Sequence, residues 1–260
     1  MSLSFTQMTR AAATEPRLAV PDSWLQGRTA YGGLVAALAL SAARRAAPDL
    51  PPLRTAQIAF LGPTAGELAF EAGVLRAGRS MTFVGVDARG GAGLAARCLF
   101  GFGAARESAV DSDDVPMPDV PGPDELPALA SSPDHPAFLG HFDVRVALGA
   151  PPFSGAEEAQ SLWWVRHRDE AARAGETSLV GLGDVLPPAV LSMLAAPAPA
   201  ASVTWQLDLL TDAHDSQGGW YLLGVAGEGA VQGYAAQAHM AWARDGEPVM
   251  AGRQGVAVFG

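Results

Sequence analysis

The feature that most constrains the fold is an internal repeat of about half the chain. In each half, one apolar helix candidate precedes four strand-like segments that are separated by glycine-containing turns. The first half reads "GGLVAALALSAARRAA", then "RTAQIAFL", "LAFEAGVLRAG", "SMTFVGVDARGG" and "GLAARCLFGFG". The second reads "PPAVLSMLAA", then "ASVTWQLDLL", "GWYLLGVAGEG", "VQGYAAQAHMAWARDG" and "VMAGRQGVAVFG". Turns such as "ARGG" and "ARDGEP" favour antiparallel hairpins, so the sequence predicts two copies of one supersecondary unit.

The ends of the two copies can be overlaid, with "AARCLFGFG" on "AGRQGVAVFG". This overlay sets Cys98 opposite Gln254, and it sets Tyr31 and Gly32, at the start of the first helix, near Asp184. Each half is expected to be a long central helix wrapped by an antiparallel sheet, which is an α+β arrangement. The segment 110–136 is rich in proline and acid and has no periodic apolar face, so we expect an N-terminal unit at 1–109, a linker at 110–136 and a C-terminal unit at 137–260.

Composition excludes several classes of protein. The net charge of −10, with no basic stripe, argues against a nucleic-acid partner. The longest apolar run, "GGLVAALALSAA", is too short to span a membrane. The N-terminal segment lacks the apolar core of a signal peptide, so a cytoplasmic protein is expected. A single cysteine excludes an internal disulfide, and the scattered histidines have no metal-ligand spacing, so no metal is expected.

Asp184, in "GLGDVLPPAVL", has two interpretations. It could cap the helix that follows, since aspartate is a preferred N-cap residue. The prolines weaken this interpretation, because the third helical residue would be Pro187, which has no N–H to donate. If Pro187 instead opens the helix, Asp184 lies outside the capping position and its carboxylate is free to face a pocket.

The other candidate residues are equally open on their own. Gly32 and Gly33 could serve close packing of the helix on the sheet, or could expose N–H groups to a developing negative charge. Gln254 is a polar residue on an otherwise apolar strand face, where a buried amide needs partners. Cys98 has no histidine beside it and is interpreted as a small buried hydrophobe.

Four segments in this order, "GRTAYGGLVAALAL", "RTAQIAFLGPTAGE", "GLGDVLPPAVL" and "DGEPVMAGRQGVAVF", resemble the double-hotdog acyl-CoA thioesterases, the acyl-CoA thioesterase II-like group. The resemblance covers nearly the whole chain except the acidic segment. In that family an aspartate at the start of the second-half helix, a serine or threonine on the next strand and a glutamine on the last strand hold a water molecule. Asp184 and Gln254 match two of these residues.

The hydroxyl is ambiguous, because "ASVTWQLDLL" offers Ser202 and Thr204, and a two-residue strand repeat would point both to the same face. Our alignment favours Ser202. The resemblance also favours the oxyanion interpretation of Gly32 and Gly33, with Tyr31 beside them.

The resemblance implies hydrolysis of an acyl-CoA by general-base activation of water, in one composite site per chain and without a cofactor. Acyl-CoA is the expected partner, and exposed sheet edges suggest a homodimer or higher oligomer. Two alternatives stay open: a hotdog hydratase or dehydratase of enoyl thioesters, and a non-catalytic acyl-CoA-binding or assembly module. The first usually pairs a carboxylate with a histidine, and no histidine lies near Asp184 or Gly32 in the sequence.

Overall fold

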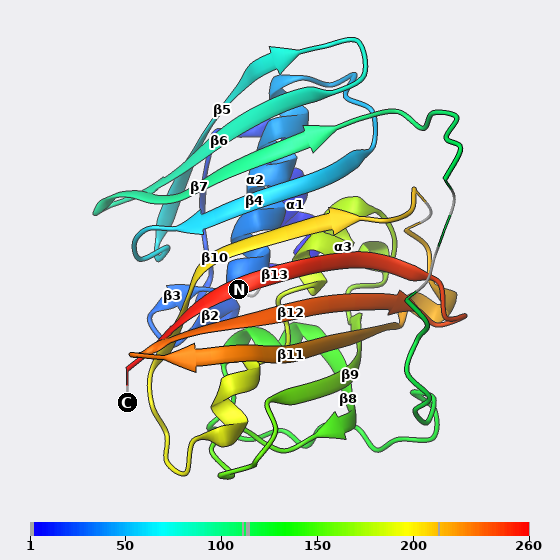
Figure 1. Ribbon diagram of the computed structural model, residues 1–260. Coiled ribbons are helices and arrows are strands. Elements are labelled where there is room, and N and C mark those ends of the chain that lie inside the picture. Colours follow the sequence, from blue (N-terminus) through cyan, green and yellow to red (C-terminus); the bar gives the residue numbers. More distant parts are fainter. Residues whose placement is uncertain (1–2, 111, 113–114, 213, 260) are drawn as a thin grey trace.

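The computed structural model describes residues 3–110, 112, 115–212 and 214–259. Its described strands form one antiparallel sheet of 11 strands, in the order β1-β5-β6-β7-β4-β10-β13-β12-β11-β9-β8, and a separate pair β2-β3. Figure 1 shows the helices α1, α2 and α3 together on one face of the large sheet. We call this the inner face. The predicted α+β arrangement of helices on an antiparallel sheet is therefore confirmed.

The elements of the first half are α1 (Phe5–Thr14), β1 (Arg17–Ala19), the 3-10 helix η1 (Asp22–Trp24), β2 (Leu25–Gln26), β3 (Thr29–Ala30), α2 (Gly32–Ala46), β4 (Leu53–Phe60), β5 (Glu67–Ala77), β6 (Thr82–Gly90) and β7 (Gly93–Phe102). Those of the second half are η2 (Ala137–His141), β8 (Phe142–Gly149), β9 (Gln160–His167), η3 (Glu170–Ala172), α3 (Glu176–Leu182), η4 (Ala189–Met193), β10 (Ala200–Leu209), η5 (Gln217–Gly219), β11 (Tyr221–Val231), β12 (Tyr234–Ala243) and β13 (Pro248–Val258). All eight strands expected from the repeat are present.

The order of the strands displays the repeat directly. β4 and β10 pair at the centre of the sheet, and outward from them the order is β7, β6, β5 on one side and β13, β12, β11 on the other. Cys98 lies between Ile58 and Val86 on its neighbouring strands. Gln254 occupies the matching position, between Trp205 and Gln237. The overlay of Cys98 on Gln254 that the sequence predicts is therefore confirmed by strand register.

Helix α2 is the central buried element of the first half. Nine of its fifteen residues are alanine or leucine, which have high helix propensity, and its residues from Gly33 to Ala43 are all buried. Arg44 and Arg45, in its last turn, interact favourably with the negative end of the helix dipole. Arg44 also donates to Glu176 of α3 at 2.8 Å, which joins the helices of the two halves.

The prediction of an α-helix at "PPAVLSMLAA" is wrong. The α-helix of the second half is α3, which has seven residues and ends at Leu182, ahead of Asp184. The proline-containing segment forms only the five-residue 3-10 helix η4, because Pro187 and Pro188 cannot donate helical hydrogen bonds. Asp184 therefore follows a helix rather than starting one.

The acidic segment packs against the second half along its described residues. The indole N–H of Trp164 donates to the Pro121 carbonyl at 2.9 Å, and that of Trp242 donates to the Val115 carbonyl at 2.9 Å. The segment covers an apolar cluster on the outer sheet face, formed by Leu162, Trp164, Trp220, Leu222 and Trp242. It thus shields apolar surface from water, a role that its composition does not reveal.

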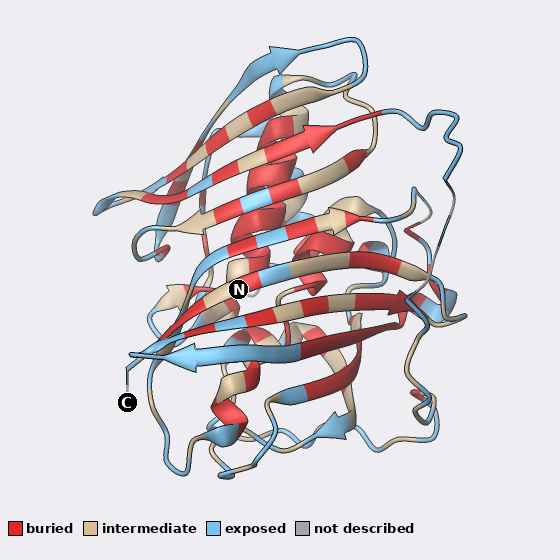
Figure 2. Cartoon of the chain, in the orientation of Figure 1, coloured by how far each residue is buried: buried red, intermediate tan, exposed pale blue. Residues whose placement is uncertain are grey.

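The core lies between the sheet and the helices. Figure 2 shows burial over α2 and in alternating positions along the central strands. On β10, Trp205, Leu207 and Leu209 are buried and face the helices. Inner-face residues of the central strands thus sit beside α2 and α3, which is where the candidate site is found.

Candidate active site

Three polar side chains meet on the inner face of the second half. The Gln254 amide donates from Nε2 to Asp184 Oδ1 at 2.8 Å and to Ser202 Oγ at 2.9 Å. Gln254 comes from β13, Ser202 from β10, and Asp184 from the connection between α3 and η4. Gln254 is buried, so its amide needs these partners.

The end of α3 places Asp184. The helix stops at Leu182, and the Val185 N–H donates back to the Leu182 carbonyl at 3.1 Å, which turns the chain. A side chain at Gly183 would displace the Met250 side chain of β13, because its Cβ would lie 2.7 Å from Met250 Cε. Asp184 makes no capping hydrogen bond: the residue preceding η4 is Pro188. The N-cap interpretation of Asp184 is therefore wrong.

The start of α2 lies directly against this carboxylate. A Cβ on Gly32 would lie 2.6 Å from Asp184 Oδ2, so only glycine permits this approach. The Gly33 backbone N–H donates to the Asp184 carboxylate. The N-terminus of α2 also has a favourable dipole for negative charge. A helix of the first half and an acid of the second half therefore meet, although Gly33, expected as an oxyanion donor, here serves the carboxylate.

Tyr31 ties the two halves together at this point. Its hydroxyl donates to the Gly181 carbonyl at 2.9 Å and accepts from the Asp184 backbone N–H. Its ring stacks on Phe138, with centroids 4.1 Å apart. Burial raises the pKa of Tyr31 well above its usual value, and the nearby Asp184 charge raises it further. Tyr31 is therefore a neutral hydroxyl that orients the backbone around Asp184.

The environment of Asp184 makes it a stronger base than an ordinary carboxylate. Burial raises the pKa of Asp184 to about 7, and the hydrogen bonds from Gln254 and Gly33 oppose that rise. None of the ion pairs in the described part of the chain involves Asp184. A carboxylate with a pKa near neutrality matches the requirement for general-base chemistry.

Ser202 and Thr204 do not face the same side of the sheet, so that expectation is wrong. Ser202 pairs with Val256 and Thr204 with Gly255, and the register shifts between them because of a β-bulge at Val203. Ser202 stays on the inner face and bonds Gln254, whereas Thr204 is exposed on the outer face. The structure brings Ser202, and not Thr204, to Asp184.

Two further polar residues join this cluster, and neither was predicted from the sequence. Gln237 and His239 are buried on β12, and Gln237 Nε2 donates to Gln254 Oε1 at 2.8 Å. The available signal was the strand alternation in "AAQAHMA", which places both on the face that also holds small apolar residues. The histidine was not near Asp184 in sequence, although β12 lies beside β13.

Cys98, at the matching position of the first half, has no such surroundings. It is buried, and burial raises the pKa of its thiol to about 12, so a reactive thiolate is not formed near neutral pH. Among the residues that the structure describes, no group of three histidine, cysteine or acidic residues could hold a metal ion.

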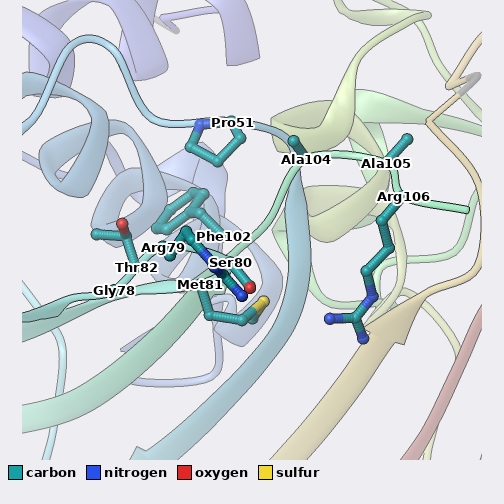
Figure 3. Close-up of a pocket in the computed structure, with 10 residues that line it drawn as sticks. All are labelled: Pro51, Gly78, Arg79, Ser80, Met81, Thr82, Phe102, Ala104, Ala105 and Arg106. Atoms are coloured by element: carbon teal, nitrogen blue, oxygen red, sulfur yellow. The ribbon is translucent and has the colours of Figure 1, made fainter.

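Two hollows of the surface do not include Asp184 among their lining residues. A cavity of about 420 Å³ lies near the far end of α2, where Arg44 of the last turn stacks on Phe102. Figure 3 shows Arg106 on one side of it, across from Pro51, Arg79 and Phe102. A groove of about 630 Å³ crosses the centre of the sheet; the residues that line it include Thr204, Gln206, Arg253 and Gln254. The cavity of Figure 3 does not include the Asp184 cluster.

Comparison with known structures identifies the fold. A conserved protein with a hotdog fold from Alicyclobacillus acidocaldarius matches with a TM-score of 0.84 and 23% identity, over 94% of this chain and 92% of that one. An acyl-CoA thioesterase II from Mycobacterium marinum matches with a TM-score of 0.72 and 22% identity, over 93% and 91%. The TesB protein of Mycobacterium avium subspecies paratuberculosis matches with a TM-score of 0.76 and 18% identity, over 98% and 99%. The chain is a double hotdog, as the resemblance implied.

Family comparison goes one step further. The family model for the acyl-CoA thioesterase N-terminal domain matches residues 20–103, and that for the C-terminal domain matches residues 113–258. The chain therefore belongs to the acyl-CoA thioesterase family. No curated protein sequence matches it. Within the described residues, every helix is too short or too polar to cross a bilayer.

Proposed function

We propose that this protein hydrolyses an acyl-CoA thioester, with Asp184 as the general base, in one composite site built by both halves. Family membership supports the substrate class. The observation that carries the mechanism is the partly buried Asp184 carboxylate, whose pKa is raised to about 7 while an uncharged amide and a hydroxyl adjoin it. An arginine partner would instead hold the pKa low and weaken the base.

The proposed reaction needs no covalent enzyme intermediate. Asp184 takes a proton from a water molecule that Ser202 and Gln254 orient, and the hydroxide forms a bond to the thioester carbonyl carbon. Collapse of the tetrahedral intermediate breaks the carbon–sulfur bond, and the thiolate of CoA leaves and takes up the proton from Asp184. Orientation of the water lowers the barrier by removing the entropy loss from the chemical step.

Gly33 has a specific part in this proposal. Its N–H donates to the Asp184 carboxylate in the resting structure. When Asp184 gains the proton from water, the carboxyl group loses its charge and becomes a weaker acceptor. The Gly33 N–H is then free to donate to the thioester oxygen, where the negative charge now develops, at the N-terminus of α2. In this proposal the Gly33 N–H donates first to the Asp184 carboxylate and then to the oxyanion.

The hydratase alternative receives no support from His239. Its Nε2 lies 2.7 Å from Gln237 Nε2, and the ring also interacts with the Gly183 backbone and the Gln254 side chain, so the partners of His239 lie inside the protein. Burial lowers the pKa of His239 to about 4, which keeps the ring neutral. A histidine that delivers protons to an enoyl thioester would need one nitrogen directed at the substrate.

The test is thiol release from acyl-CoA esters of short, medium and long chain length. The wild type is expected to turn over at least one of them, and Asp184→Asn to lose at least about 100-fold in kcat, as expected when a general base is removed. Asp208→Asn, an acid on the outer face of β10, is the matched control and should retain activity. Acyl-CoA binding without turnover by the wild type would support the non-catalytic alternative, and a fully active Asp184→Asn variant would refute the base assignment.

A further inference from the structure

The side chain of Gln254 can face Asp184 in two ways, and only one of them helps a base. With Nε2 toward the carboxylate, the amide donates a hydrogen bond to Asp184. With the amide rotated by half a turn, Oε1 would face the carboxylate oxygen, and two acceptors would repel each other. Something must therefore fix the rotation of the Gln254 amide.

The fixed point is a backbone N–H, whose direction cannot be reversed. The Ala189 N–H, at the start of η4, donates to Gln237 Oε1 at 2.7 Å. Because Oε1 of Gln237 is the acceptor there, its Nε2 must point the other way. That Nε2 donates to Gln254 Oε1 at 2.8 Å, which leaves Nε2 of Gln254 to face Asp184 and Ser202.

His239 completes the same chain of hydrogen bonds. Gln237 Nε2 also lies 2.7 Å from His239 Nε2, so this ring nitrogen must be the unprotonated acceptor. The proton is then on Nδ1, and the His239 ring also interacts with the Gly183 backbone. Three ends of the chain, Gly183, Asp184 and Ala189, thus lie between the end of α3 and the start of η4, and the fourth is Ser202 on β10.

We propose that Gln237 and His239 are positioning residues that set the rotation of the Gln254 amide and so direct its N–H group at Asp184. The inference rests on the proposed function, since it concerns the base of that reaction. Neither residue touches the reacting atoms in this account. The three inner-face side chains Gln237, His239 and Gln254 are all buried, so bulk water does not compete for their hydrogen bonds.

The consequence to measure is the ionisation of Asp184. The hydrogen bond from Gln254 favours the charged carboxylate, and its loss raises the pKa of Asp184 further. Tyr31, at the start of α2, interacts directly with Asp184, and His239, on β12, contacts the Gln254 side chain that bonds Asp184. Burial raises the pKa of Tyr31 and lowers that of His239 to about 4. Neither group therefore changes charge between about pH 5.5 and 9, which is the pH range of the test.

The first experiment compares Gln237→Met with Gln206→Met, a glutamine on the outer face of β10. Methionine keeps the size of the side chain but removes its donor and acceptor. In Gln237→Met, the acid limb of kcat/KM against pH should move up by about one pH unit, and kcat/KM at pH 7 should fall about fivefold, from the lost hydrogen bond to the charged form. Gln206→Met should match the wild type. If Gln237→Met is folded and its acid limb lies at the same pH as that of the wild type, the inference is overturned.

The second experiment separates the two ring nitrogens of His239. His239→Gln retains an acceptor near the position of Nε2, whereas His239→Asn retains only a donor near that of Nδ1. His239→Gln should keep the wild-type acid limb, and His239→Asn should move it upward. Equal limbs in the two variants would contradict the role of His239. This pair also decides the question if Gln237→Met fails to fold, which unfolding curves would show.

A readout without turnover keeps this inference distinct from the proposed function. Carbon-13 NMR titration of the Asp184 carboxyl, assigned by its disappearance in Asp184→Asn, reports the same ionisation directly. An upward shift in Gln237→Met supports the positioning role even if no acyl-CoA is hydrolysed. An unchanged titration refutes it even if the protein is an active thioesterase.

Discussion

The two halves of the sheet present the same four inner-face positions, and only the second half makes them polar or aromatic. In the first half all four residues are buried and apolar, and in the second they include the hydrogen-bonded amides. The matched residues, in the order first half and second half, are Cys98 and Gln254, Val86 and Gln237, Ala88 and His239, and Ile58 and Trp205. Duplication has kept the register and changed the chemistry.

The helices of the two halves also differ, in length and in where they end. α2 of the first half has fifteen residues, whereas α3 of the second has seven. The long helix offers a buried N-terminus, and the short one ends early enough for the chain to turn Asp184 toward it. Each half therefore supplies what the other lacks: one gives backbone N–H groups and the other gives the acid with its amide partners. The two copies of the unit therefore differ in side chains and in helix length while their strand order stays the same.

The largest expected effect comes from making the second half resemble the first. Gln254→Cys removes the amide that contacts both Asp184 and Ser202. We expect a loss of about 100-fold in kcat/KM, comparable to the loss of one preorganised hydrogen-bond donor at other reaction centres. Thiol release from the preferred acyl-CoA measures it. Wild-type kcat/KM in this variant would show that the contrast between the halves has no catalytic meaning.

The reciprocal substitution, Cys98→Gln, is the control for that swap. It places an amide among Ile58, Val86 and Ala88, where the strand neighbours offer no side-chain partner. A buried unpaired amide and the added volume should lower the free energy of unfolding by about 3 kcal/mol. Denaturant unfolding measures this, and the folded fraction should keep its turnover.

A smaller effect is expected at the hydroxyl. Ser202→Ala removes the Oγ that accepts from Gln254 at 2.9 Å, and kcat should fall about tenfold because one of the groups that orient the water is lost. Thr204→Ala removes a hydroxyl from the outer face, beyond the bulge, and should leave kcat unchanged. If Thr204→Ala rather than Ser202→Ala lowered kcat, the assignment of Ser202 as the hydroxyl of the site would be wrong.

Much of this architecture could be predicted from the sequence, for identifiable reasons. The two sets of four strands follow from glycine-bounded apolar segments, and the placing of Cys98 opposite Gln254 follows from the repeat. The prediction of an α-helix after Asp184 was wrong, because it gave more weight to the apolar pattern of "PPAVLSMLAA" than to the two prolines that prevent helical hydrogen bonds. The bulge at Val203 was not foreseen, since a regular two-residue period cannot reveal an inserted residue.

The site was foreseen in part. Asp184, Gln254 and the start of α2 were named, and the structure brings them together. Gln237 and His239 were missed, because their importance depends on which side chain faces which across β12 and β13. A sequence gives the alternation of a strand but not the direction of a hydrogen bond. The covering of the tryptophans by residues of the acidic segment is likewise a matter of tertiary contact.

The most direct test is the pH dependence of kcat/KM for the wild type with its preferred acyl-CoA. A protonated carboxyl cannot accept a proton from water, so kcat/KM should fall tenfold for each pH unit below the pKa of Asp184. Since burial raises that pKa to about 7, the midpoint of the acid limb should lie near neutrality. A midpoint near the ordinary carboxyl value of about 4, or no acid limb at all, would contradict Asp184 as the general base.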